Sequence, residues 1–307
     1  LITTDEETGM TGAFGLQPDI LRGEVLLNLD SEEEGELYIG CAGGVNVTST
    51  FRYSKIETAS DDIAVKVVVS GLQGGHSGLD INRGRANANK LLFRFLKFAV
   101  ANYEAMLVEV NGGNMRNAIP REAYAVLTID KEDKNDFIEA VEEFEEMFRE
   151  EYADSEPDIS FDTKIVERPS MVMDEMSADD LINAVQGSTN GVVKMSSSVE
   201  NMVETSTNLA IVETLEETIR VKYLVRSSID CAKDDVVSSL ESVCRLAGAE
   251  VEIDGEYPGW KPNKDSRTLK TMIDVYRNLY GKEPNVTAIH AGLECGLFTE
   301  KFPGLDM

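Results

Sequence analysis

Apolar residues follow two patterns along this chain, one spaced and one continuous, and these patterns predict where helices and strands lie. Over residues 88–99 and 137–148 they recur every three or four positions, which predicts two helices with one buried face each. The opposite face of the second helix is almost all glutamate, as expected where a helix meets water. Apolar and β-branched runs predict strands at 63–69, 105–110, 123–129, 207–214 and 218–225.

The predicted elements follow the order β-α-β-β-α-β, and that order recurs. The second unit contains strands 207–214 and 218–225, a helix over 236–247 and a closing strand at 250–253, and we expect its first half around residues 178–193. Two such units predict a doubled ferredoxin-like module of sheet and helices.

Both ends of the chain have the pattern of an α/β domain. Runs at 25–29 and 37–41 predict buried strands, 269–279 predicts a helix, and 285–289 predicts a strand that ends at His290. Residues 1–4 also have the character of a strand. The chain starts without an initiator Met and stops without a cap, so we expect an internal piece of a longer polypeptide. The fold class is α/β, with residues 1–45 and 256–307 as two pieces of one domain and 46–255 inserted between them.

Charge and composition narrow the classes of function. The 307 residues carry 56 Asp and Glu against 29 Lys and Arg, a net charge of −27. This excess argues against binding to nucleic acid or to an anionic membrane, since both need a basic surface. No apolar run approaches the ~20 residues that span a bilayer. The four scattered cysteines indicate reduced thiols and a cytoplasmic protein.

Three carboxylates stand at the ends of predicted strands. Glu6 and Glu7 are adjacent, and Asp30 follows them by about one strand–helix–strand unit. Ligands of open α/β sheets bind at the carboxyl ends of strands, so we expect the three side chains at one edge. Of two neighbouring carboxylates, one can hold a metal while the other takes a proton from metal-bound water. Adjacent glutamates are also common on plain protein surfaces.

Two glycine-rich loops offer polar side chains. His76 lies within Gly-Gly-His-Ser-Gly, where a histidine is better suited to donating a hydrogen bond to an oxyanion than to filling a core. Asn117 lies in the polar link 112–120 between two strands. This link is either a plain hairpin loop or a device that places Asn117 against a ligand carbonyl or carboxylate.

Further candidates follow two other strands. Arg226 either pairs with a carboxylate of this acidic chain or clamps a substrate carboxylate in bidentate fashion. His290 and Glu294 lie where a strand leads into a turn, a common place for site residues. The sequence has no GxSxG elbow, P-loop or GxGxxG after a strand, so it gives no support to a serine hydrolase or a nucleotide-binding protein.

The order of the motifs is more specific than any one of them. They run DEETGMTGAFGL, NLDSEEEGELYIGCAGG, GGHSGLDINRGRANANKLL, GGNMRNAIP, VRSSID and HAGLECGLF. Over essentially its whole length the chain thereby resembles the bacterial aminoacyl-histidine (Xaa-His, or cytosol non-specific) dipeptidases. Those belong to the di-zinc exopeptidase family that also holds carboxypeptidase G, aminoacylase and carnosinase.

The resemblance implies a fold and an activity. It implies a partial catalytic domain with an inserted α+β lid domain made of two ferredoxin-like units, and a homodimer formed through the lid. The implied activity is hydrolysis of dipeptides, preferentially Xaa-His, by a water that two zinc ions activate. Glu6 would be the general base, and Glu7 and Asp30 would each ligate one zinc, with cobalt or manganese as substitutes.

The resemblance also implies roles for the remaining candidates. His76 and Asn117 would reach the scissile carbonyl or its oxyanion from the lid, His76 across a dimer interface. Arg226 would bind the C-terminal carboxylate of the dipeptide. His290 and Glu294 would line the substrate pocket.

One departure from the family pattern concerns the metal ligands. The family also uses an upstream His, a bridging Asp and a His near the C-terminus, and none of the three is present here. We therefore expect the 307-residue chain alone to bind zinc poorly and to be inactive. The alternatives are an aminoacylase or tripeptidase of the same family, or a non-catalytic acidic binding or dimerisation module.

Overall fold

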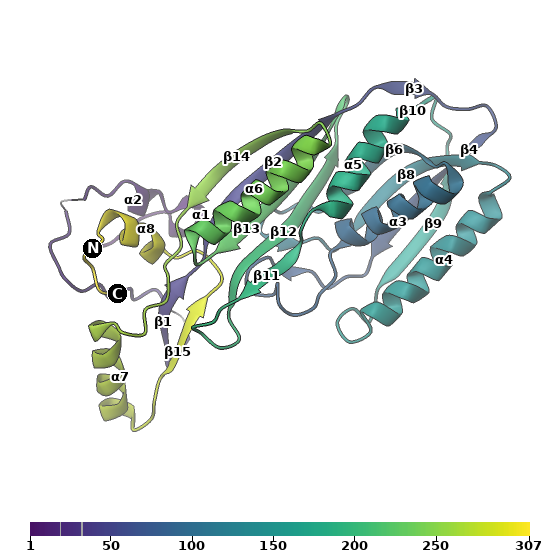
Figure 1. Ribbon diagram of the computed structural model, residues 1–307. Coiled ribbons are helices and arrows are strands. Elements are labelled where there is room, and N and C mark those ends of the chain that lie inside the picture. Colours follow the sequence, from purple (N-terminus) through teal and green to yellow (C-terminus); the bar gives the residue numbers. More distant parts are fainter. Residues whose placement is uncertain (19, 32) are drawn as a thin grey trace.

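An antiparallel sheet of nine strands forms the larger part of the molecule (Figure 1). The computed structural model describes residues 1–18, 20–31 and 33–307, apart from the side chains of residues 7 and 8. The strand order is β14-β2-β13-β12-β6-β8-β4-β9, and β11 pairs with β12. The strands are β2 (Gly43–Arg52), β4 (Asp62–Ser70), β6 (Met106–Gly112), β8 (Ala123–Asp130), β9 (Ser160–Val166), β11 (Gly191–Met195), β12 (Val203–Thr214), β13 (Thr218–Ser227) and β14 (Glu250–Tyr257).

The order of these strands shows two ferredoxin-like units, one nested inside the other. Four helices lie on one face of the sheet (Figure 1), and they are α3 (Ala88–Tyr103), α4 (Lys134–Glu151), α5 (Glu175–Gly187) and α6 (Asp230–Leu246). One unit is β4-α3-β6-β8-α4-β9. The other is β2-α5-β12-β13-α6-β14, so the chain completes the first unit between β2 and α5. The two units meet where β12 pairs with β6.

The prediction of two such units is confirmed, but the expected start of the second one was wrong. Residues 178–193 provide its helix, α5, and the small strand β11, whereas its first strand is β2. The first five residues of β2 are all buried, so this strand lacks the apolar–polar alternation that marks a half-exposed strand.

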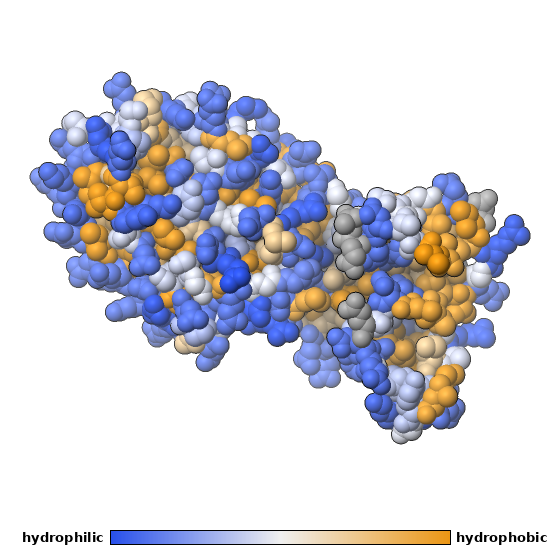
Figure 2. All heavy atoms as spheres, turned by 180° about the vertical axis from the view of Figure 1, so that it is seen from behind, coloured by the Kyte–Doolittle hydropathy of each residue, from blue (hydrophilic) through white to orange (hydrophobic). Residues whose placement is uncertain are grey.

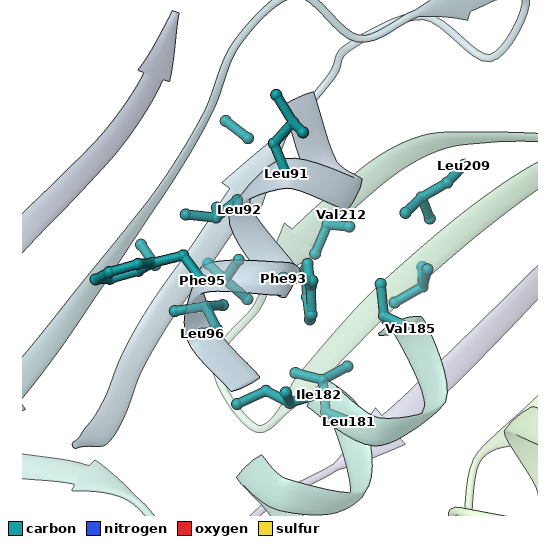
Figure 3. Close-up of a cluster of buried hydrophobic side chains, with 14 of the residues drawn as sticks. Leu91, Leu92, Phe93, Phe95, Leu96, Leu181, Ile182, Val185, Leu209 and Val212 are labelled. Carbon is teal, nitrogen blue, oxygen red and sulfur yellow. The ribbon is translucent and has the colours of Figure 1, made fainter. Parts of the chain in front are cut away.

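The helices pack on the sheet through the apolar stripes that predicted them. Asn87 accepts a hydrogen bond from the backbone N–H of Lys90 and so caps the start of α3. Phe95 of α3 is fully buried, and burial of such a side chain contributes about 1.5–3 kcal/mol. Figure 3 shows the contact between α3, α5 and β12, made by Leu91, Leu92, Phe93, Phe95, Leu96, Leu181, Ile182, Val185, Leu209 and Val212.

A smaller region contains both ends of the chain (Figure 1). Strand β1 (Glu36–Cys41) pairs in parallel with β15 (Asn285–Ile289), which confirms both predicted strands. The predicted helix is α7 (Arg267–Tyr280). The remaining helices of this region are α1 (Glu6–Gly9), α2 (Thr11–Phe14) and α8 (Glu294–Lys301). Two further two-stranded sheets belong to the larger part of the molecule, and they are β3 (Lys55–Glu57) with β10 (Met171–Met173) and β5 (Gly75–His76) with β7 (Ala118–Ile119).

Two expectations for this region were wrong, and one was confirmed. The chain turns at His290 as expected, and helix α8 follows that turn. Residues 1–4 form no strand. Residues 25–29 make one isolated bridge, between Val25 and Asp306, instead of a strand. An apolar run becomes a buried strand only where partners cover it, and here Leu27 and Leu29 are 52% and 89% exposed.

The surface of the molecule narrows between the two regions (Figure 2). The figure also shows apolar side chains on the smaller region, and the exposed ones there include Leu29, Leu279 and Tyr280.

Among the described residues, no helix has the length and apolar character needed to cross a membrane. The division into residues 1–45, 46–255 and 256–307 stays a prediction.

Candidate functional site

Two short strands bring the two predicted lid residues together. His76 ends β5 and pairs with Ala118 of β7, the residue after Asn117. The Ser77 N–H also donates to the Asn117 carbonyl at 2.8 Å. Gly74 and Gly75 have φ values of 64° and 134°, which L side chains rarely adopt, so the loop needs glycine just before His76. Residues about forty positions apart in sequence thus lie on adjacent backbone segments.

The hydrogen bonds of the His76 ring determine where its proton resides. Nδ1 accepts from the N–H groups of Gly78 at 3.2 Å and Leu79 at 3.0 Å. The neutral ring must therefore carry its hydrogen on Nε2. Burial lowers the pKa of His76, the charge of Arg226 lowers it further, and Asp80 acts in the opposite direction. At neutral pH the ring is an uncharged donor through Nε2.

Arg226 connects this loop to the smaller region. It lies near the end of β13 and is 5% exposed. Its Nε donates to the Ser77 hydroxyl at 3.4 Å and its Nη1 donates to the Tyr257 hydroxyl at 3.1 Å. Both acceptors are neutral, and among the described residues no carboxylate lies at ion-pair distance from the guanidinium. The pairing of Arg226 with a carboxylate of this chain, one of the two alternatives above, is therefore not seen in the described part.

His290 lies where the two regions touch. It is 5% exposed, and its Nε2 is 2.7 Å from the Ser206 hydroxyl. Burial lowers the pKa of His290 to about 3, Arg226 and His76 act in the same direction, and the Val203 backbone acts against them. A Cβ at Gly78 would overlap the carbonyl oxygen of His290, so the loop backbone packs directly on the end of β15.

Glu294 begins α8 and is 8% exposed. Its Oε2 accepts a hydrogen bond from the Thr3 hydroxyl at 2.8 Å. The carboxylate therefore ties the first residues of the chain to the segment after β15.

A cavity of about 930 Å³ opens between the two regions, and three predicted site residues line it. These are Glu6, Asp30 and His290, together with Gly78 and Leu79 of the loop. His76, Asn117, Arg226 and Glu294 are not among the lining residues. The described candidates thus include a hydrogen-bonded set of His76, Asn117 and Arg226 and a cavity-lining set of Glu6, Asp30 and His290. Glu294 belongs to neither set.

The described residues do not complete a metal site. Among them, no three or more His, Cys, Asp or Glu side chains are grouped closely enough to hold an ion. Glu6 and Asp30 are oxygen donors of a suitable kind that line the same cavity, and the side chain of Glu7 lies outside the described residues. The chain offers part of a donor set, and a further donor would have to join it.

Sequence reasoning missed Ser77, Ser206 and Tyr257, which connect the candidates. Ser206 had a detectable signal, because it belongs to a run of polar residues, 204–208, within a strand that is buried throughout that stretch. A buried polar run needs partners, and this one meets His290. Tyr257 gave no comparable signal.

Comparison with known proteins gives three findings. Residues 67–156 match the family model described as a peptidase dimerisation domain. The whole chain is 41% identical, over 308 aligned residues, to the cytosol non-specific dipeptidase of Escherichia coli, of which it spans 63%. The crystal structure of aminoacylhistidine dipeptidase from Vibrio alginolyticus matches 99% of the chain with a TM-score of 0.96 at 44% identity, and 62% of that protein is covered. The chain thus spans less than two thirds of either relative.

Proposed function

Because this chain belongs to the M20 peptidase family, we propose that the complete protein is a cytosolic, metal-dependent dipeptidase. The observation that carries the proposal is the buried guanidinium of Arg226, which has only neutral partners among the described residues and lies in a hydrogen-bonded set with His76 and Asn117. A buried charge of this kind calls for an anionic ligand. The free carboxylate of a short peptide meets that need.

Arg226 would select substrates by their C-terminal carboxylate. A guanidinium has five N–H groups in a planar fork, and Ser77 and Tyr257 engage two of its nitrogens. Nη2 remains to donate to one carboxylate oxygen, and the second N–H of Nη1 can donate to the other. A fixed carboxylate limits the distance to the scissile bond, and therefore restricts the substrate to very short peptides.

His76 and Asn117 would act on the scissile carbonyl. The Nε2 hydrogen of the neutral His76 ring can be donated to the oxyanion that forms when water attacks. Asn117 is exposed at the end of the loop, so its amide is free to donate to a substrate carbonyl. His290 and Glu294 would support the pocket wall.

Glu6 would accept the proton of the attacking water and pass it to the leaving amine. Glu7 and Asp30 would contribute oxygen ligands to two zinc ions, with the remaining donors supplied from beyond the described residues. When bound, such an ion supplies Lewis acidity that activates water and polarises a carbonyl.

A homodimer through residues 46–255 is also part of the proposal, and the matched dimerisation domain supports it. In that dimer His76 would serve the substrate bound by the partner subunit. Mixing two inactive forms of the complete protein, His76→Ala and Glu6→Gln, tests this role. Mixed dimers that regain part of the activity support it, because one site then combines both intact residues. Mixtures that stay as inactive as the two parents contradict it.

The substrate class is tested by comparing rates for β-Ala-His, Gly-Gly, N-acetyl-His and β-Ala-His amide. The proposal predicts hydrolysis of both dipeptides, faster for β-Ala-His, and little for the amide, which has no carboxylate for Arg226. Preference for N-acetyl-His would identify an aminoacylase instead. Absence of any hydrolysis by the metal-loaded complete protein would favour a binding module.

A further inference from the structure

One buried carboxylate closes the base of the loop that carries His76. Glu156 is 1% exposed and follows α4 in the chain. Its Oε2 accepts from the backbone N–H of Gln73 at 2.7 Å, and its Oε1 accepts from the backbone N–H of Ala86 at 2.9 Å. These two amides bracket residues 74–85. A single side chain from a distant segment therefore fixes both ends of the loop.

Among the described residues, the partners of the buried Glu156 carboxylate are two backbone N–H groups. Within the described part of the chain, Glu156 forms no ion pair, so its charge is held by N–H groups alone. A buried carboxylate is costly unless its oxygens are hydrogen-bonded, and here each oxygen has one donor. The neighbouring Ser155 hydroxyl also donates to the Gly84 carbonyl at 2.9 Å, so the same segment holds the loop at three points.

A continuous set of contacts leads from the base of the loop to His76. Arg85, next to Ala86, donates to the Gly74 carbonyl at 2.5 Å and lies 3.4 Å from Asp80. Asp80 accepts from the backbone N–H of His76 at 2.9 Å. The His76 ring is then held by the two N–H groups that follow it in the same loop. Any widening of the base changes the geometry of these bonds.

We propose that Glu156 is a positioning residue, which holds the loop in the one conformation that fixes the tautomer of His76 and presents its Nε2 hydrogen. The use of the Nε2 hydrogen on a substrate rests on the proposed function. The effect of Glu156 on the His76 tautomer depends only on bonds within this chain, so it can be measured without any substrate.

The test is Glu156→Gln, read by nitrogen-15 NMR of the histidine rings. The chain has only two histidines, so His76 and His290 give two ring systems that are easily assigned. Glutamine keeps the size of the side chain, but its NH₂ group must face one of the two backbone donors. We expect the His76 ring to change from one fixed tautomer to an average of two, while His290 keeps its wild-type signals.

Asp174→Asn is the matched control. Asp174 also binds two backbone N–H groups, of Ser54 at 2.8 Å and Ser177 at 3.0 Å, but at the start of α5. This variant should leave both histidines unchanged. Wild-type His76 signals in Glu156→Gln would overturn the proposal, and so would equal changes in both variants.

A measurement on the unmodified chain applies if Glu156→Gln does not fold. The amides of Gln73 and Ala86 should exchange with solvent slowly and at similar rates, because one carboxylate protects both. Exchange as fast as that of exposed loop amides would overturn the proposal. In the complete enzyme, Glu156→Gln should lower kcat about tenfold to a hundredfold with little change in KM. If the wild-type enzyme hydrolyses no dipeptide, the proposed function fails, whereas the NMR result still decides the role of Glu156.

Discussion

Replacing Arg226 with methionine should separate substrate binding from folding stability. Arg226 is 5% exposed, and among the described residues its guanidinium donates only to Ser77 and Tyr257. Because the donor is charged, each of these bonds contributes about 1.5–3 kcal/mol net. Leaving the charge buried without a carboxylate partner costs a comparable amount or more. Methionine fills similar space without a charge, so the free energy of unfolding should change by less than about 2 kcal/mol.

The loss of substrate binding should be much larger. Two charge-assisted hydrogen bonds to a substrate carboxylate contribute about 1.5–3 kcal/mol each, or about 3–6 kcal/mol together. Since 1.4 kcal/mol is about a tenfold change, kcat/KM for β-Ala-His should fall at least about a hundredfold. The rate for β-Ala-His amide should hardly change, because that substrate has no carboxylate to lose.

The assay compares kcat/KM for the free dipeptide and its amide in the complete wild-type protein and in Arg226→Met, with urea unfolding measured in parallel. Arg220→Met is the matched control, because Arg220 lies on the same strand but is only partly buried. It should retain the wild-type preference. If Arg226→Met still prefers the free dipeptide as strongly as wild type does, the reasoning about the buried charge is refuted.

Two further predictions concern His290 and the loop packed on it. Because the pKa of His290 is lowered from 6.5 to about 3, the unfolded chain binds a proton between these pH values that the folded chain does not. The free energy of unfolding should therefore fall by about 1.4 kcal/mol per pH unit as the pH drops through this window. His290→Gln should remove this contribution, as measured by urea unfolding near pH 6 and pH 5. An unchanged pH dependence in the variant would contradict the lowered pKa of His290. Gly78→Ala introduces a Cβ that overlaps the His290 carbonyl, so kcat should fall far more than in Gly304→Ala, where a Cβ meets open space. Equal effects of the two substitutions on kcat would argue against that packing.

Three of the four helices on the large sheet, α3, α4 and α6, and most of its strands could be predicted because each buries one face. Phe95 and Phe137, for example, belong to stripes whose period matches a helix. Strand β2 gave no such signal because it is buried on both sides over much of its length. The segment 25–29 gave a false signal, since an apolar run does not show whether a neighbouring strand will cover it.

The candidate site was predictable residue by residue but not as an arrangement. His76, Asn117 and Arg226 were each indicated by their motifs. The strands that join the first two contain only two residues each, too few to carry a pattern. The contacts of Ser77 with Asn117 and Arg226 depend on tertiary packing that no local pattern encodes.

The central claim is that this chain supplies the general base of a metal-dependent dipeptidase. Its most direct test is kcat of the complete, zinc-loaded protein with Glu6→Gln, measured on β-Ala-His together with the bound metal. The account predicts unchanged metal content and a fall in kcat of about a hundredfold to ten-thousandfold, because the amide cannot accept the proton of water. A rate near that of wild type would contradict it.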